Sequence, residues 1–163
     1  RQMCIRDSFY RQASFADFEA RAHAKVEAGE ALTADVLNNL YADVFADYYG
    51  DAVHANELNQ IEWSRIPHFL RSDNFYVYQY STSFVAATAL AKMIIDEGEP
   101  ARERYLTMLK SGSNDYPVAL LKKAGIDMTS TAPIEATIAV FDDLVDQLEV
   151  ALDEINALAV TRH

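Results

Sequence analysis

The segment FYVYQYSTSFVAATALAKMIID, residues 75–96, decides the fold class of this 163-residue chain. Apolar or small side chains occupy every side of it, and alanines crowd its second half. A helix without a polar face is buried, and small residues let neighbouring helices approach closely. The segment also contains Gln79 and Lys92, and such side chains are rare in hydrocarbon. We therefore expect the buried central helix of a water-soluble domain and not a membrane span.

The sequence before this segment predicts further helices and no β-strand of useful length. Apolar residues recur at spacings of three and four in residues 14–28, and again after Thr33, a candidate N-cap. Pro67 disfavours helical geometry at the residue before it, so a break is expected at Ile66. Glycine and proline are scarce, at 5 and 4 residues, which agrees with a helical chain.

A short helix is expected between Asp115 and Gly125, after the central segment. Asp115 is a candidate N-cap for it, and Pro117 lies just inside its start. If Gly125 is the left-handed residue that follows this helix, Leu121 and Ile126 meet in the apolar contact of a Schellman end.

The last expected helix begins near Pro133 and carries an apolar seam. The seam residues follow one another at alternating spacings of four and three, in the order Ile134, Ile138, Phe141, Val145, Leu148, Leu152 and Ile155. A sustained seven-residue repeat predicts a narrow line of contact with other helices. The contact lies within the same domain or, as the alternative, with a second copy of the chain. The architecture that these segments predict is an all-α helical bundle.

Composition excludes several classes of partner. The chain carries 25 acidic and 14 basic residues, for a formal charge of −11, and no cluster of Lys or Arg interrupts this excess. Such a chain repels phosphate groups, so neither nucleic acid nor an anionic membrane surface is an expected partner. The single cysteine, Cys4, excludes a disulfide scaffold and fits a reducing, cytoplasmic location.

The first eight residues, RQMCIRDS, show no helical period. We expect residues 1–8 to be a non-native or disordered leader and residues 9–163 to form the helical domain.

No complete catalytic motif occurs in the sequence. The four histidines, His23, His54, His68 and His163, include no pair at the i, i+4 spacing of HExxH, so no metal site can be assembled from spacing. Nucleophile-elbow and phosphate-loop motifs are also missing.

Although complete catalytic motifs are missing, the sequence contains one cluster of polar aromatic residues. His68 is followed by Tyr76, Tyr78 and Tyr80, at the start of the segment expected to be buried. By residue type, these are either core residues with satisfied hydrogen bonds or donors for a developing oxyanion.

Four blocks of sequence carry a resemblance to a known family. They are FYRQASFADFE (9–19), EWSRIPHF (62–69), FYVYQYSTSF (75–84) and LKSGSNDYPVALLKKAGIDM (109–128). In this order they resemble the C-terminal part of the oligoendopeptidase F family, relatives of thimet oligopeptidase. The resemblance implies a mostly helical zinc endopeptidase that cleaves short peptides.

The family's zinc ligands, an HExxH motif and a later Glu, lie before the region that these blocks match. The resemblance therefore implies a C-terminal fragment that binds no zinc, is inactive alone, and has the missing N-terminal part of the same protein as its partner. The oligopeptide substrate and the zinc belong to the intact enzyme. Two alternatives are a freestanding helical interaction module that lost the chemistry, and a complete enzyme with an unrecognised site.

The resemblance also implies roles for the polar cluster. His68 and Tyr76 become catalytic residues that face the scissile carbonyl, with Tyr76 as the main oxyanion donor, and Tyr80 and Tyr78 become substrate-binding residues. Attack by metal-bound water puts negative charge on the carbonyl oxygen, and loss of one fixed donor there costs about 2.7–4 kcal/mol. The chain departs from the family in a longer segment after His68 and in Ser83, where glycine is usual.

Overall fold

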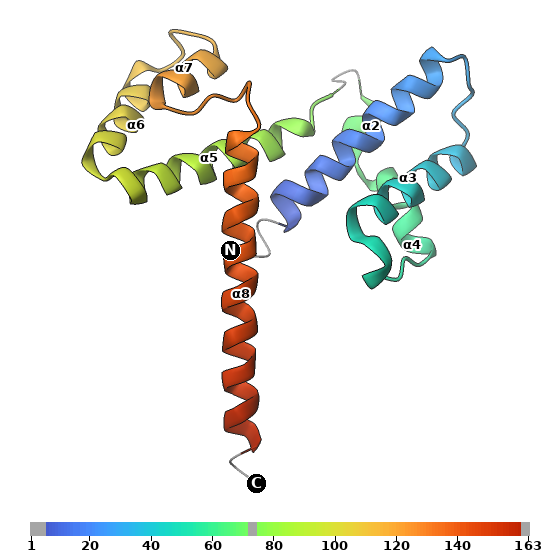
Figure 1. The fold of residues 1–163 in the computed structure, drawn as a ribbon. Coiled ribbons are helices and arrows are strands. Elements are labelled where there is room, and N and C mark those ends of the chain that lie inside the picture. The colour runs from blue at the N-terminus through green and yellow to red at the C-terminus, as the bar shows by residue number, and fades with distance from the viewer. Residues whose placement is uncertain (1–5, 72–74, 161–163) are drawn as a thin grey trace. The chain divides into compact units, whose positions relative to one another are not determined.

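The computed structural model describes residues 6–71 and 75–160, with side chains up to residue 157. Every regular element in these ranges is a helix, which confirms the expected all-α architecture (Figure 1). Cys4, His163 and the first five residues of the expected leader lie outside the described residues. The chain divides into two compact units, residues 6–82 and residues from 83 onward, named here the N-terminal and C-terminal units.

The N-terminal unit is built on two helices that lie side by side, α2 and α3 (Figure 1). Its elements are η1 (Arg6–Tyr10), α2 (Arg11–Glu27), α3 (Ala34–Tyr49), η2 (Gly50–Ala52), α4 (Glu57–Gln60), η3 (Glu62–Arg65) and η4 (Pro67–Leu70). Its core residues are Phe15, Phe18, Ala22, Leu40, Tyr41, Val44, Phe45 and Val77. The last three residues of the expected leader, 6–8, belong to η1, a single turn of π-helix.

Local signals in this unit act as the sequence predicts. The Thr33 side chain accepts a hydrogen bond from the Val36 N–H at 3.3 Å, so it caps α3. Ile66 is extended, with φ −99° and ψ 95°, and it separates η3 from η4. Both predictions are confirmed.

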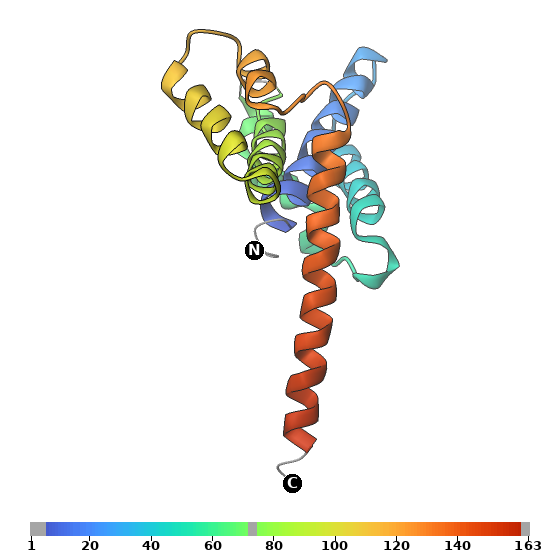
Figure 2. The ribbon, with the colours of Figure 1, turned by 60° about the vertical axis from the view of Figure 1, so that its left-hand side comes forward.

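The C-terminal unit contains most of α5 (Tyr78–Glu97) together with α6 (Glu99–Ser111), α7 (Pro117–Ala124) and α8 (Ala132–Val160). Helices α5, α6 and α7 lie close together (Figure 2), and side chains from all three form a second apolar cluster. Its residues are Ala89, Leu90, Ala124 and Ile126, with Met93, Tyr105, Met108, Leu121 and Met128 packed against them.

The end of α7 is the predicted Schellman motif, whereas its start differs from the prediction. The Ile126 N–H donates to the Leu121 carbonyl at 2.9 Å, and Gly125 is left-handed with φ +109°. Asp115 is not the N-cap. That position is Tyr116, and Asp115 lies one residue too early to reach the helix, so it accepts the Tyr116 N–H at 2.8 Å instead.

The central segment is less buried than its composition predicts. Helix α5 begins at Tyr78, three residues later than expected, because Phe75 has a positive φ of 58° that no helix allows. Its buried residues form one side only, namely Ser81, Val85, Ala86, Ala89 and Leu90. The prediction of burial on every side is therefore wrong for the described residues, where packing covers a single face of the helix.

The apolar seam of α8 is also largely uncovered. Its exposed members, between 37% and 61% accessible, are Ile134, Ile138, Leu148, Leu152 and Ile155. The expected packing of the whole seam on its own domain is therefore wrong within the described residues. None of the described helices combines the length and the apolar character that crossing a membrane requires.

Candidate functional site

Three of the four residues that the sequence singles out lie together in the N-terminal unit. The His68 and Tyr76 rings are stacked, with centroids 5.2 Å apart and planes inclined by 12°. Tyr80 meets both rings edge-on, with centroids 6.5 Å from His68 and 5.8 Å from Tyr76. His68 comes from η4 and Tyr80 from the first turn of α5, so the cluster joins two elements. We name these three residues the ring cluster.

The fourth residue, Tyr78, stands apart. It shows no ring contact with the cluster among the described residues, and it follows Val77, which is only 1% exposed. The structure therefore groups Tyr76 and Tyr80 with His68 and leaves Tyr78 outside.

The tyrosines are not core residues in this chain. Tyr76, Tyr78 and Tyr80 are 40%, 49% and 45% exposed, so the reading of the tyrosines as satisfied core residues is wrong for the described chain. Partial removal from water raises the pKa of Tyr80, and the adjacent Tyr76 hydroxyl raises it further. A hydroxyl with a raised pKa keeps its proton at neutral pH, which is the form that can donate a hydrogen bond.

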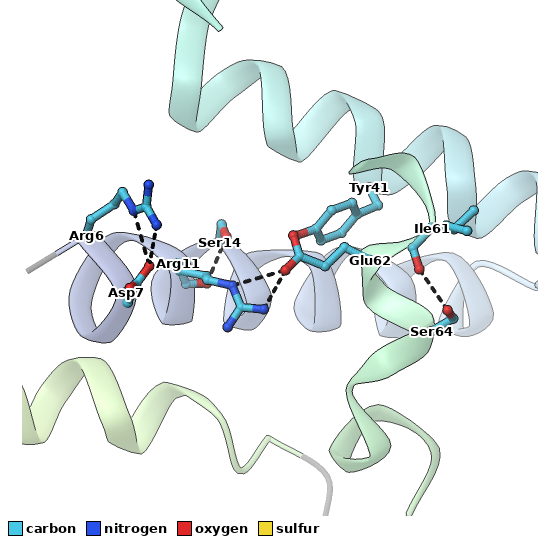
Figure 3. Close-up of polar contacts among 8 residues, drawn as sticks. All are labelled: Arg6, Asp7, Arg11, Ser14, Tyr41, Ile61, Glu62 and Ser64. Carbon is cyan, nitrogen blue, oxygen red and sulfur yellow. Dashed lines mark hydrogen bonds and ion pairs between the residues drawn. The ribbon is translucent and has the colours of Figure 1, made fainter. Parts of the chain in front are cut away.

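An ion pair fixes the segment that leads into His68. The Arg11 guanidinium of α2 pairs with the Glu62 carboxylate at the start of η3, and the Tyr41 hydroxyl of α3 donates to the same carboxylate at 3.2 Å (Figure 3). The Arg11 guanidinium also lies 4.6 Å from the centre of the Phe15 ring. Three elements therefore converge on Glu62, six residues before His68.

Phe69, the residue after His68, anchors η4 on the core. Its ring lies 5.9 Å from that of Phe15 and 5.2 Å from that of Phe18, between centroids. An apolar pocket of about 250 Å³ borders the same region and includes Phe69, Leu70 and Glu19 in its wall. Because Phe69 is held in this way, the backbone of His68 has a defined position.

A second polar anchor reaches the other side of the cluster. The Phe75 N–H donates to Glu19 Oε1 of α2 at 2.8 Å, and the His23 ring lies 4.6 Å from the Phe75 ring, between centroids. Sequence reasoning missed Glu19, Arg11 and Glu62 as supports of the site. All three fall within the blocks that carry the family resemblance, so that position in the sequence was the available signal.

The described residues offer no metal centre. No group of three or more His, Cys, Asp and Glu side chains in residues 6–71 and 75–157 is arranged to hold a metal ion. The ring contacts of His68 are with the phenol rings of Tyr76 and Tyr80. The zinc that the family resemblance implies therefore does not fit the residues described in this chain.

The helical fold agrees with the class of protein that the comparisons define. The family model described as peptidase family M3 matches residues 2–140, and the chain belongs to this family. Oligopeptidase PepF of Bacillus subtilis is 46% identical over 151 residues, and the plasmid-encoded oligoendopeptidase F of Lactococcus lactis is 42% identical over 150 residues. The predicted family is thereby confirmed.

The solved structures give the same answer, over a limited part of each relative. The crystal structure of oligoendopeptidase-F from Enterococcus faecium matches with a TM-score of 0.84 and 46% identity, covering 90% of this chain and 28% of that one. The alignments with the two curated relatives include 93% and 92% of this chain. They include only 22% and 25% of the relatives' own lengths. The chain thus spans about a quarter of the relatives it matches.

Proposed function

We propose that this chain supplies the substrate-facing side of an oligopeptidase active site and contains none of the zinc ligands. His68 and Tyr76 are the catalytic residues, and their role is to donate hydrogen bonds to the carbonyl oxygen of the peptide bond being cleaved. Tyr80 and Tyr78 contact the substrate peptide. The chain alone is inactive and requires the remainder of the enzyme, which provides the zinc centre.

The observation that carries this proposal is the stacking of Tyr76 on His68 at 5.2 Å. Hydrolysis of a peptide bond develops negative charge on the carbonyl oxygen, and donors already in place stabilise that charge without reorganising. A stacked pair in which each ring restrains the other is pre-organised in this sense. Both rings come from segments held by α2, so their separation is fixed by the fold of the N-terminal unit.

The exposed apolar seam of α8 supports the proposal that the chain requires the rest of the enzyme as its partner. The uncovered seam of α8 runs along a helix that carries seven acidic residues and no Lys or Arg between positions 132 and 157. Two such helices would bring like charges together, which disfavours a second copy as the partner. Because the relatives are about four times as long, a further part of the same enzyme is the partner that we propose.

A chimera tests the proposal. In it, the segment of Bacillus subtilis PepF that this chain matches is replaced by this chain, and cleavage of an internally quenched oligopeptide is measured together with zinc content. We expect zinc binding and turnover by the chimera, and neither by the 163-residue chain alone.

Two results would count against the proposal. Turnover by the isolated chain would show a complete site within it. A folded, zinc-loaded chimera without turnover would show that the ring cluster no longer serves catalysis, which favours the interaction module instead.

A further inference from the structure

We propose that Glu19 is a positioning residue, which holds the backbone of Phe75 so that the next residue, Tyr76, stacks on His68. The consequence for catalysis rests on the function proposed above, but the positioning itself is a property of the N-terminal unit. Glu19 acts on the ring cluster through its hydrogen bond with the backbone of Phe75, the residue before Tyr76.

Glu19 is buried to an unusual degree for a carboxylate. The residue is 3% exposed, and its Oε1 accepts the Phe75 N–H at 2.8 Å across 56 positions of sequence. Its Oε2 has no hydrogen-bond partner among the described residues. Acidic side chains are almost never buried without a partner, and the bond to the Phe75 N–H is the hydrogen bond that offsets the burial of Glu19.

That bond acts at a strained point of the backbone. Phe75 has φ +58°, and it is the only described residue other than glycine with a positive φ. A bulky residue adopts this conformation only where its surroundings impose it. Glu19 holds the Phe75 N–H, and His23, one helical turn further along α2, lies 4.6 Å from the Phe75 ring between centroids. Glu19 and His23, which lie one helical turn apart on α2, therefore hold the backbone and the side chain of Phe75.

The conformation of Phe75 decides the course of the chain into Tyr76. A change of φ at Phe75 to the negative values that phenylalanine prefers would rotate everything that follows relative to α2. Since η4 is anchored separately through Phe69, His68 would stay while Tyr76 moved. Loss of the Glu19 acceptor should therefore separate the two stacked rings without disturbing η4.

Substitutions at Glu19 separate the effect of its side-chain length from the effect of its charge. Glu19→Gln keeps an oxygen acceptor at the same distance and removes the charge. Glu19→Asp keeps the charge and withdraws the oxygen by one methylene. If the hydrogen bond to Phe75 is what matters, Gln preserves the stacking, and Asp and Ala both abolish it.

The readout is NMR of the 163-residue chain, through the ring-proton shifts of His68 and the hydrogen exchange of the Phe75 amide. The Tyr76→Leu variant lacks the stacked ring, so it provides the reference values of the His68 chemical shifts for the unstacked state. We expect Glu19→Ala and Glu19→Asp to move the His68 shifts most of the way to those values and to accelerate exchange at Phe75 at least tenfold. Glu19→Gln should match the unsubstituted chain.

Ala22→Gly is the matched control, because Ala22 is buried on the same helix and its methyl group cannot accept the Phe75 N–H. It should leave the His68 shifts unchanged. Unchanged His68 shifts in Glu19→Asp, or equal changes in Ala22→Gly, would overturn the proposal. Should Glu19→Ala fail to fold, the comparison of Glu19→Asp with Glu19→Gln gives the same decision.

In the chimera, Glu19→Asp should lower kcat with little change in KM or zinc content, and Glu19→Gln should restore kcat. An inactive chimera with no substitution at Glu19 would count against the proposed function alone. The NMR result stands or falls separately, so the two failures are distinguishable.

Discussion

The hydroxyl of Tyr41 donates a hydrogen bond to Glu62 Oε2 at 3.2 Å, which joins α3 to η3 across 21 positions of sequence. Tyr41 is 2% exposed, and Glu62 also receives the guanidinium of Arg11. The segment that carries His68 thus starts from a carboxylate held by two helices at once.

Removal of this carboxylate should destabilise the N-terminal unit. Glu62→Ala leaves a buried tyrosine hydroxyl and a partly buried guanidinium without their acceptor, at a cost of about 2 kcal/mol. Urea unfolding gives the difference. Lys25→Ala is the control, since its ion pair with Glu30 is more exposed and should contribute less than about 1 kcal/mol. Equal losses in both variants would contradict the role of Glu62.

The same contact predicts a dependence of stability on pH. Burial raises the pKa of Tyr41, and the Glu62 carboxylate raises it further, so the folded chain holds the proton more tightly than the unfolded chain. The resulting stability is fully present below the unfolded-state pKa of about 10. It is lost as the pH rises toward the folded-state pKa.

Tyr41→Phe isolates this effect. Between pH of about 8 and about 11, which brackets the ordinary tyrosine pKa, this variant should lose less unfolding free energy than the unsubstituted chain. Burial also raises the pKa values of Tyr48 and Tyr49. Both residues are present in the two proteins, so their contributions to the pH dependence cancel in the comparison. Identical losses over the interval would show that Tyr41 does not couple folding to pH.

Two glycines at helix ends should respond differently to alanine. Gly125 has φ +109° and ψ 5°, and a Cβ there would lie 2.9 Å from Met93 Sδ, the end of a flexible side chain that can move, so Gly125→Ala should cost about 1–2 kcal/mol. Gly112 has φ +57° and ψ −140°, a combination that is almost exclusive to glycine, so Gly112→Ala should cost about 3 kcal/mol of backbone strain although nothing lies within 4 Å of a Cβ. Thermal unfolding of both variants checks the order, and a reversed order would contradict the structure at these two helix ends.

The seam of α8 should matter for association and not for folding of this chain. Leu148 and Leu152 are 41% and 49% exposed, so replacing both by Glu should change the unfolding free energy by less than about 0.5 kcal/mol. In the chimera the same pair should lower the melting temperature, because the seam is then covered.

Gln147→Glu adds a charge to the same helix away from the seam and serves as the control. A large loss of stability in the isolated chain would show instead that α8 packs on its own domain.

Local sequence signals predicted most of the helices and several of their ends. Thr33, Pro67 and Gly125 act within a few residues of their own positions, so their effects can be predicted without tertiary structure. The grouping of His68 with Tyr76 came from the family resemblance, which implied roles for both. Residue types alone left two readings open.

The remaining features depend on contacts between distant positions. The bond from Glu19 to Phe75 spans 56 residues, and the positive φ of Phe75 has no glycine to signal it. The exposure of Tyr76 was mispredicted for a related reason. An apolar composition predicts burial, but it does not say whether the partner surface lies within the described chain.

Tyr76→Phe in the chimera tests the central claim most directly, because it removes one hydroxyl and leaves the stacked ring in place. The account predicts a fall in kcat of about 100- to 1000-fold, as for loss of one oxyanion donor, with zinc content unchanged and Tyr78→Phe far less affected. Undiminished turnover by the Tyr76→Phe chimera would contradict the assignment of Tyr76 as the oxyanion donor.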